Sequence, residues 1–165
     1  MQATAIDIAP ATPDDVPLLL ALIGELADYE GLAEQVTATE PTLRGSMFGG
    51  RPAAEALIAR VGGEAAGFAL FFHNFSTFLG RPGLYLEDLF VRPAFRGRKI
   101  GKRLLAHLAK LAVQRDCPRV EWAVLDWNAP ARRFYESLGA VANAEWIPHR
   151  LSGAALRRLA ESGER

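Results

Sequence analysis

The amino-acid sequence predicts an α/β fold with a mixed sheet (α+β) flanked by helices, formed as one domain over residues 1–165. Segments of alternating apolar residues, typical of half-buried strands, are interleaved with segments whose apolar residues recur at helical spacing. Some of the expected strands are joined by tight turns and others by a helix, which favours a sheet with antiparallel and parallel pairs. The chain has 165 residues, of which 50% are hydrophobic and 23% charged, so it is long enough for one apolar core.

Turn and capping residues set the expected limits of each element. We expect strands, a hairpin turn and a loop in this order: Ala5–Ala9, Ala54–Val61, Gly62-Gly63 as the turn, Glu64–His73, Asn74–Gly83 as the loop, Leu84–Val91, Arg119–Leu125, Ala140–Asn143 and Trp146–Leu151. We expect helices from Thr12 to about Tyr29, from Thr39 to Gly49, over Gly97–Arg115, from Asn128 to Leu138 and over Gly153–Ala160. Thr12 followed by Pro13 is a typical helix start, and Gly31 is a typical helix end.

The composition excludes several classes of protein. Nineteen basic and nineteen acidic residues give a formal net charge of zero, which argues against a nucleic-acid partner. The single cysteine, Cys117, excludes an internal disulfide and a Cys-rich metal site, and the three histidines show no metal-ligand spacing. The longest apolar stretch, Val16–Ile23, is shorter than the roughly 18 residues that span a membrane, and no signal peptide is visible. We therefore expect a cytoplasmic protein with no metal and no membrane partner.

A strand followed by a basic, glycine-containing loop and a helix predicts an anion site after Val91. Glycine lets backbone N–H groups approach phosphate oxygens, and a helix N-terminus carries partial positive charge. Formal charge is added in or near the same turn by Arg96, Arg98, Lys99 and Lys102. The Gly-Lys-Ser/Thr of nucleotide triphosphatases and the dinucleotide fingerprint are both missing. The alternative is an ordinary basic surface loop.

Two further groups of polar residues are candidates for chemistry. Glu87 and Asp88 interrupt an otherwise apolar strand, and neighbouring strand residues point to opposite faces, so at least one carboxylate faces a packed side or a cleft. The alternative is an edge-strand carboxylate in water. Asn128 and Tyr135 lie two helical turns apart on the helix after the strand Arg119–Leu125, so both can face one cleft. The alternative for Tyr135 is a core or surface tyrosine on an amphipathic helix.

These segments together resemble the acetyl-CoA-dependent N-acetyltransferases of the GNAT superfamily, most closely the diamine (spermidine/spermine) acetyltransferase group. The resemblance covers nearly the whole chain. It rests on Pro10-Ala11-Thr12, Glu25–Glu30, Glu34-Gln35-Val36, Leu84–Val91, Arg96–Gly101, Trp127-Asn128-x-Pro130, Phe134-Tyr135, Gly139-Ala140 and Trp146. The family pattern for the pyrophosphate loop is Arg/Gln-x-x-Gly-x-Gly/Ala, and here Lys99 replaces its middle glycine. Cofactor binding is expected to survive this change as long as position 99 does not need a positive φ.

The resemblance implies direct acetyl transfer from acetyl-CoA to a primary amine, with a central, mostly antiparallel sheet that is splayed at the acetyl-CoA site. It places the cofactor against Leu89, Phe90, Val91, Arg96, Gly97, Arg98, Lys99, Ile100, Gly101, Lys102, Asn128 and Tyr135. The Leu89 N–H would polarise the thioester carbonyl. Tyr135 would be the general acid for the leaving thiolate, and Glu87, acting through water, would accept the proton of the amine.

The acceptor is expected to be a small cation, because many carboxylates are candidates to surround it. The predicted substrate-binding residues are Tyr29, Glu30, Glu87, Asp88, Glu121, Asp126, Glu145 and Trp146. A diamine or polyamine fits them, and a thialysine- or lysine-like amino acid is the alternative within the same group. A peptide or protein N-acetyltransferase and a non-catalytic acyl-CoA-binding protein are further alternatives. By resemblance the protein is expected to be a homodimer, with the expected strand Trp146–Leu151 at the contact.

Overall fold

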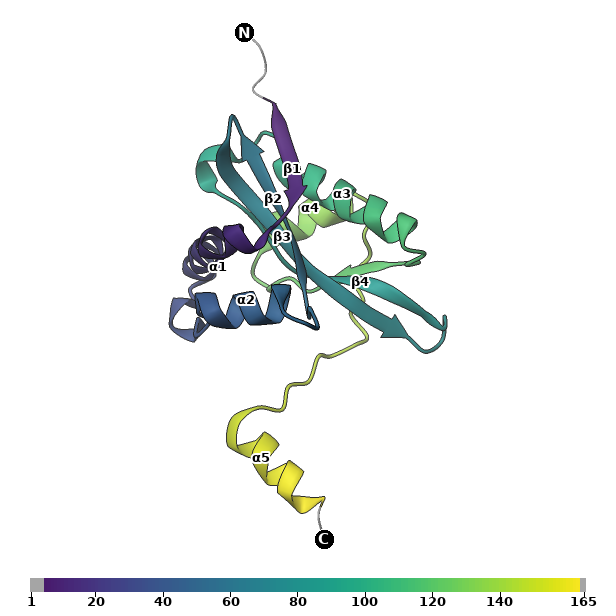
Figure 1. The fold of residues 1–165 in the computed structure, drawn as a ribbon. Helices are drawn as coiled ribbons and strands as arrows, with labels where there is room; N and C mark the ends of the chain where they lie inside the picture. The colour runs from purple at the N-terminus through teal and green to yellow at the C-terminus, as the bar shows by residue number, and fades with distance from the viewer. Residues whose placement is uncertain (1–4, 164–165) are drawn as a thin grey trace. The chain divides into compact units, whose positions relative to one another are not determined.

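The computed structural model, drawn in Figure 1, describes residues 5–163. These residues divide into two compact units between Ala123 and Val124. The first unit contains β1 (Ile6–Pro10), α1 (Val16–Glu30), α2 (Glu40–Phe48), β2 (Glu55–Val61), β3 (Glu64–Ser76), β4 (Arg81–Val91), α3 (Ile100–Gln114) and β5 (Val120–Trp122). Short 3-10 helices lie at Pro13–Asp15, Ala33–Gln35 and Pro93–Phe95. The second unit contains α4 (Ala129–Ser137) and α5 (Gly153–Ser162). One domain over residues 1–165 stays a prediction.

The strands form one five-stranded mixed sheet in the order β1-β2-β3-β4-β5. The first four strands pair antiparallel, and β4 and β5 pair parallel, so the sheet is mixed as the sequence predicts. Gly62 and Gly63, both with positive φ, form the tight turn between β2 and β3. The parallel pair is short, because it joins only Leu84–Leu86 to Val120–Trp122.

β4 has two irregularities near its last residues, a β-bulge and an edge without a partner among the described strands. Leu70 pairs with Asp88 and Phe71 with Leu86, so Glu87 is an extra residue that has no partner on β3. Such a β-bulge bends the strand and increases its local twist. Beyond Leu86 no described strand pairs with the opposite edge of β4. The backbone of residues 87–91 is therefore an open edge of the sheet, next to two carboxylates.

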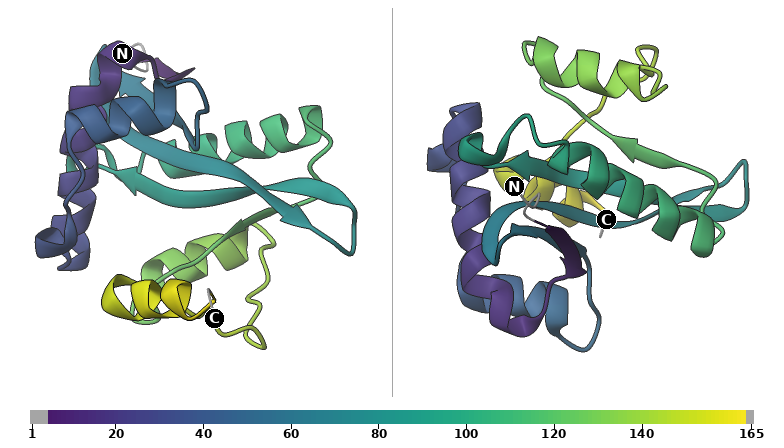
Figure 2. Two further views of the ribbon diagram at one scale, coloured as in Figure 1. Left: turned by 60° about the horizontal axis from the view of Figure 1, so that its bottom comes forward. Right: turned by 90° about the horizontal axis from the view of Figure 1, so that it is seen from above.

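Helices cover both faces of the sheet in the first unit. Figures 1 and 2 show α1 and α2 against one face and α3 against the other. The core on the α1 and α2 side is formed by Leu19, Leu22, Leu26, Met47, Ala56, Ile58, Phe68 and Phe90. The apolar stripe of α3 is buried at Ile100, Leu104, Leu105, Leu108 and Ala112. Apolar layers therefore pack on both sides of the sheet that contains β4.

Several expected boundaries are wrong, for identifiable reasons. The segment Asn74–Gly83 is not a loop, because β3 and β4 continue as a hairpin in which Ser76 pairs with Arg81. Pro82 suggested a loop, yet it lies near the start of a strand, where proline is tolerated. The strand expected at Arg119–Leu125 is limited to β5.

The third expected helix begins later than its apolar pattern suggests. It starts at Ile100 instead of Gly97, because Gly97 and Lys99 both adopt positive φ (77° and 62°), which a helix does not allow. It ends in a Schellman motif in which Cys117 N donates to the Ala112 carbonyl at 2.8 Å. Asp116, with φ of 55°, occupies the left-handed position that glycine usually takes.

The strands expected at Ala140–Asn143 and Trp146–Leu151 are absent from the described chain, in which no strand follows α4. Apolar residues are present in both segments, but no partner strand supplies a hydrogen-bonded ladder there. Val141, Trp146 and Ile147 are 91%, 72% and 76% exposed. The final helix does form, as α5.

Candidate functional site

The loop between β4 and α3 presents backbone N–H groups that no protein group uses. Among the described residues, no hydrogen bond runs from the N–H groups of residues 97–102 to a protein acceptor, and no side chain caps α3. Two of these residues, Gly97 and Lys99, have positive φ. Consecutive N–H groups at the start of a helix bind anions through direct hydrogen bonds and the helix dipole. The predicted anion site therefore has the required backbone geometry.

Lys99, which replaces the family's middle glycine, has a positive φ, although this replacement is expected to be harmless only without one. Its φ of 62° and ψ of 18° lie in the left-handed region, where a side chain costs about 1–2 kcal/mol. The loop adopts this conformation nonetheless, and the exposed lysine adds a positive charge at the helix start. The middle position of the loop thus needs a positive φ, and lysine supplies it at some cost in stability.

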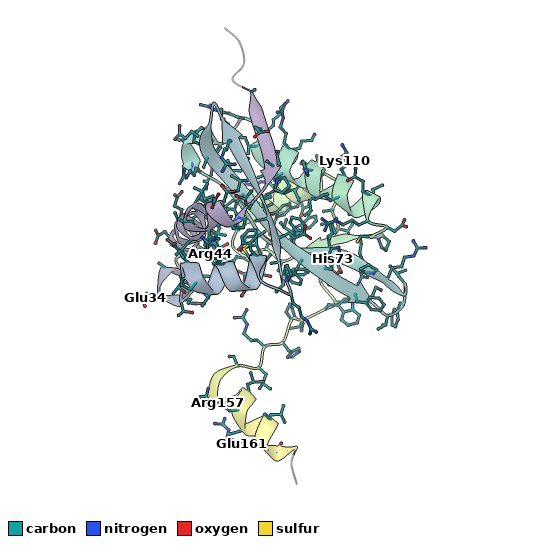
Figure 3. The ribbon with its side chains drawn as sticks, in the orientation of Figure 1. Glu34, Arg44, His73, Lys110, Arg157 and Glu161 are labelled. Atoms are coloured by element: carbon teal, nitrogen blue, oxygen red, sulfur yellow. The ribbon has the colours of Figure 1, made fainter. Side chains whose placement is uncertain are left out.

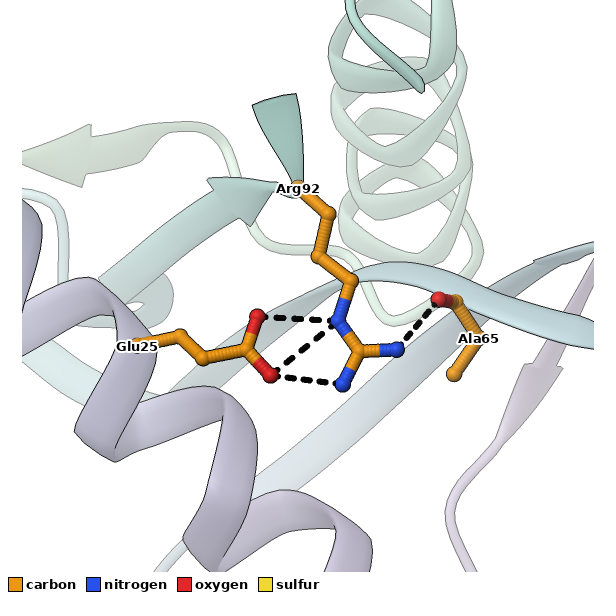
Figure 4. A network of polar contacts seen from close by, with 3 residues as sticks. All are labelled: Glu25, Ala65 and Arg92. Carbon is orange, nitrogen blue, oxygen red and sulfur yellow. Dashed lines mark hydrogen bonds and ion pairs between the residues drawn. The ribbon is translucent and has the colours of Figure 1, made fainter. Parts of the chain in front are cut away.

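Two arginines of the segment that enters this loop contact α1. Arg92 Nε lies 2.8 Å from Glu25 Oε2, and Arg92 Nη2 lies 2.6 Å from Glu25 Oε1 (Figure 4). Arg92 Nη1 also donates to the Ala65 carbonyl at 2.8 Å. The Arg96 guanidinium carbon lies 4.7 Å from the centre of the Tyr29 ring, which is a cation–π distance.

Carboxylates gather beside the open edge of β4. Burial, together with the charges of Glu87 and Glu30, raises the pKa of Asp88 from 3.8 to about 6. Burial also raises the pKa of Glu30, the last residue of α1. Asp88 is half-buried and Glu87 is exposed, as expected for one carboxylate that faces a packed side. Glu30, Glu87 and Asp88 form an acidic cluster with the charge and burial to hold an ammonium group.

Glu121 extends this acidic region but already has protein partners. Tyr85 pairs with Glu121 across β4 and β5. The pKa of Tyr85 is raised by burial and by the charges of Glu87 and Glu121. Asn74 Nδ2 donates to Glu121 Oε2 at 2.8 Å, and Arg119 Nε lies 2.9 Å from the same oxygen. The negative charge of Glu121 is therefore largely compensated, and it is a weaker candidate for binding a cation than Asp88.

The other predicted site residues belong to the second unit. Asn128 is the N-cap of α4 and its Oδ1 accepts a hydrogen bond from Ala131 N at 3.2 Å. Tyr135 lies on α4 with its ring centre 5.4 Å from that of Phe134. Asp126 and Glu145 are exposed, and Trp146 lies in a segment without a strand. The roles expected for these residues stay predictions.

The structure thus brings together Tyr29, Glu30, Glu87, Asp88 and the entry to the loop in the first unit. Sequence reasoning missed Glu25 and Arg92, which are 67 positions apart and carry no local signal. It also missed Tyr85, although that residue stands two positions before Glu87 in the same strand.

A pocket of about 560 Å³ lies elsewhere in the first unit, and none of the predicted site residues lines it. Its walls are mostly apolar and come from the end of α2, the segment before β2, the start of β2 and the second half of β3. Two polar side chains lie among them, Glu55 and His73, the latter labelled in Figure 3. The acidic cluster and the pocket are therefore separate features. Among the described residues, no group of His, Cys, Asp and Glu side chains is arranged to hold a metal ion, and no helix is long and apolar enough to cross a membrane.

Several known proteins are similar to this chain in sequence or in structure. Residues 25–140 match the family described as "Acetyltransferase (GNAT) family". Thialysine N-epsilon-acetyltransferase of Bos taurus is 38% identical over 164 residues, covering 93% of this chain and 96% of the relative. L-ornithine N5-acetyltransferase of Arabidopsis thaliana is 33% identical, covering 90% and 85%. The solved structure of an integron cassette protein from the mobile metagenome of V. cholerae has a TM-score of 0.80 and 28% identity, covering 94% and 98%.

The family match starts on α1 at Glu25 and includes the acidic cluster, the open edge of β4, the anion loop and α4. The fold of the solved structure agrees with the mixed sheet and its flanking helices. The chain therefore belongs to the acetyltransferase (GNAT) family, and the protein is an N-acetyltransferase that uses an acyl-CoA donor.

Proposed function

We propose that the donor is acetyl-CoA and that the acceptor is a terminal primary amine of a small cation, a diamine or a diamino acid. The observation that carries this proposal is the half-buried Asp88, flanked by Glu30 and Glu87, beside the open edge of β4. A cationic acceptor relieves the charge repulsion within this cluster, whereas a neutral or anionic acceptor does not.

The first unit fits the donor at two places. The free N–H groups of residues 97–102 suit a pyrophosphate, and Arg98, Lys99 and Lys102 add positive charge. The open backbone edge at Leu89–Val91 suits an extended pantetheine arm, which pairs with it like an added strand. When bound, acetyl-CoA supplies an acetyl thioester whose carbonyl is open to attack. The Leu89 N–H is the group that we assign to polarise this carbonyl.

The chain's own residues then move two protons. An alkylammonium with a pKa of about 10.4 must lose a proton before its nitrogen attacks. Asp88 holds the ammonium, and Glu87, which is exposed, accepts its proton through water. The amine nitrogen forms the new C–N bond as the C–S bond breaks, and the Tyr135 hydroxyl protonates the departing sulfur. The products are an N-acetylated amine and free CoA, and no metal is required.

The class of acceptor follows from the relatives and from the acidic cluster. The bovine and Arabidopsis relatives are named for thialysine and L-ornithine, which are amino acids with a side-chain amine. Polyamines are the second candidate, because Glu30, Glu87 and Asp88 together offer negative charge to a chain that carries several positive nitrogens.

A free-thiol release assay with acetyl-CoA tests both candidates. The panel contains thialysine, lysine, ornithine, putrescine, spermidine, spermine and a short peptide. We expect turnover of the amino acids or the polyamines and at least tenfold less with the peptide. Acetyl-CoA binding without turnover of any small amine contradicts the proposed acceptor class, and equal turnover of the peptide favours a peptide or protein acceptor. Sedimentation of the same protein tests the expected homodimer.

A further inference from the structure

Two side chains on one face of α1 contact the segment that leads into the anion loop. Glu25 and Tyr29 are four residues apart, so they lie on the same face of the helix one turn from each other. Glu25 binds Arg92, which directly follows β4, and Tyr29 lies against Arg96, which opens the loop. The next residue of α1 is Glu30, a member of the acidic cluster.

Arg92 ties three elements together at this point. Its guanidinium grips both oxygens of Glu25, at 2.8 and 2.6 Å, and donates to the Ala65 carbonyl of β3 at 2.8 Å. Its backbone N–H donates to the Ala66 carbonyl at 2.9 Å. Figure 4 shows the side chain spanning the space between α1 and β3. Bidentate arginine–carboxylate pairs fix geometry as well as adding stability.

We propose that Glu25 and Arg92 are a positioning pair, which fixes the anion loop relative to the end of α1 and thereby aligns the donor site with the acidic cluster. This inference rests on the proposed donor and acceptor sites. Loop residues begin only four positions after Arg92, so a shift of this anchor passes directly to the backbone N–H groups of residues 97–102. A small misplacement of binding groups is costly to affinity and rate.

A matched pair elsewhere in the first unit separates positioning from stability. Arg115 Nη1 and Nη2 bind the two oxygens of Glu55 at 2.6 and 2.8 Å, which joins the C-cap of α3 to the start of β2. The side chains of Arg115 and Glu55 are 32% and 44% exposed, which is close to the 25% and 39% of Arg92 and Glu25. Glu55 lines the apolar pocket and belongs neither to the loop nor to the acidic cluster.

The experiment measures CoA dissociation constants by calorimetry and the free energy of unfolding for the wild type and five variants. The variants are Arg92→Met, Arg92→Lys, Glu25→Gln, Arg115→Met and Glu55→Gln. We expect Arg92→Met and Glu25→Gln to weaken CoA binding about tenfold. Arg92→Lys should recover part of the loss, because it keeps the charge without the bidentate grip. The two control variants should lose similar stability and keep their CoA affinity within about twofold.

Steady-state kinetics give a second readout. Because Glu30 contributes to the raised pKa of Asp88, loosening the end of α1 in Arg92→Met should move the acid limb of kcat/KM to lower pH. CoA affinities that fall equally in the Arg92 and Arg115 variants overturn the positioning role while leaving the proposed function intact. A wild type that binds no CoA contradicts the donor site itself.

Discussion

Replacing Asp88 by asparagine should make the protein more stable near neutral pH, although Asp88 belongs to the proposed site. The pKa of Asp88 is raised from 3.8 to about 6, mainly by burial and then by Glu87 and Glu30. The folded state therefore binds a proton more tightly than the unfolded chain, so stability falls as pH rises from about 4 to about 6 and stays low above it. At about 1.4 kcal/mol for each tenfold change in proton affinity, the ionised carboxylate costs about 3 kcal/mol.

Some of this gain is lost, because the asparagine amide also leaves water on folding. We expect Asp88→Asn to raise the free energy of unfolding by about 2 kcal/mol at pH 8. The difference should disappear below about pH 4, where Asp88 is protonated in both states. Urea unfolding at several pH values measures both effects, and Asp7→Asn, at an exposed strand position, is the control. A gain that is independent of pH, or a loss at pH 8, would refute the electrostatic reasoning.

Three further substitutions have defined outcomes. Lys99→Gly relieves a left-handed backbone position and should raise the free energy of unfolding by about 0.5–1 kcal/mol in a denaturant titration, more than Asp116→Gly does, because aspartate tolerates that conformation better; equal or opposite changes would contradict this explanation. Gly67→Ala places a Cβ 2.3 Å from the Phe90 carbonyl oxygen and should lower the free energy of unfolding by about 2–3 kcal/mol, which is seen as a lower thermal midpoint. An unchanged midpoint would mean that the backbone of β4 shifts at no cost. Tyr135→Phe should lower kcat at least about 100-fold with little change in CoA affinity, and near-wild-type turnover would remove Tyr135 as the acid.

The sequence was sufficient for the first four strands and for the place of the anion loop, because their signals are local. Gly62-Gly63 specifies the β2–β3 hairpin, and Arg96–Gly101 joins a strand to a helix start. The conformation of Lys99 was not predictable, because a lysine gives no local sign of a positive φ. The bulge at Glu87 was also missed, since it depends on the register with β3, which the strand itself does not encode.

Interactions between distant segments were out of reach for a different reason. Glu25 and Arg92 are in contact only because α1 packs against the sheet beside β3 and β4, so the sequence around either residue does not indicate its partner. The strands expected after α4 show the reverse case, in which local apolar residues are present and the distant partner is missing. Apolar residues such as Trp146 could be buried by a strand, but a strand also needs a neighbouring backbone, and the described chain provides none there.

The open edge of β4 also matters for how the protein behaves in storage. An unpaired strand edge is a template on which another chain can add its own strand, and this is a common start of aggregation. Charged side chains at an edge discourage such pairing, and Glu87 and Asp88 stand where the edge begins. Neutralising both carboxylates by mutation should therefore make concentrated protein less soluble, even though the Asp88→Asn change alone stabilises the folded chain.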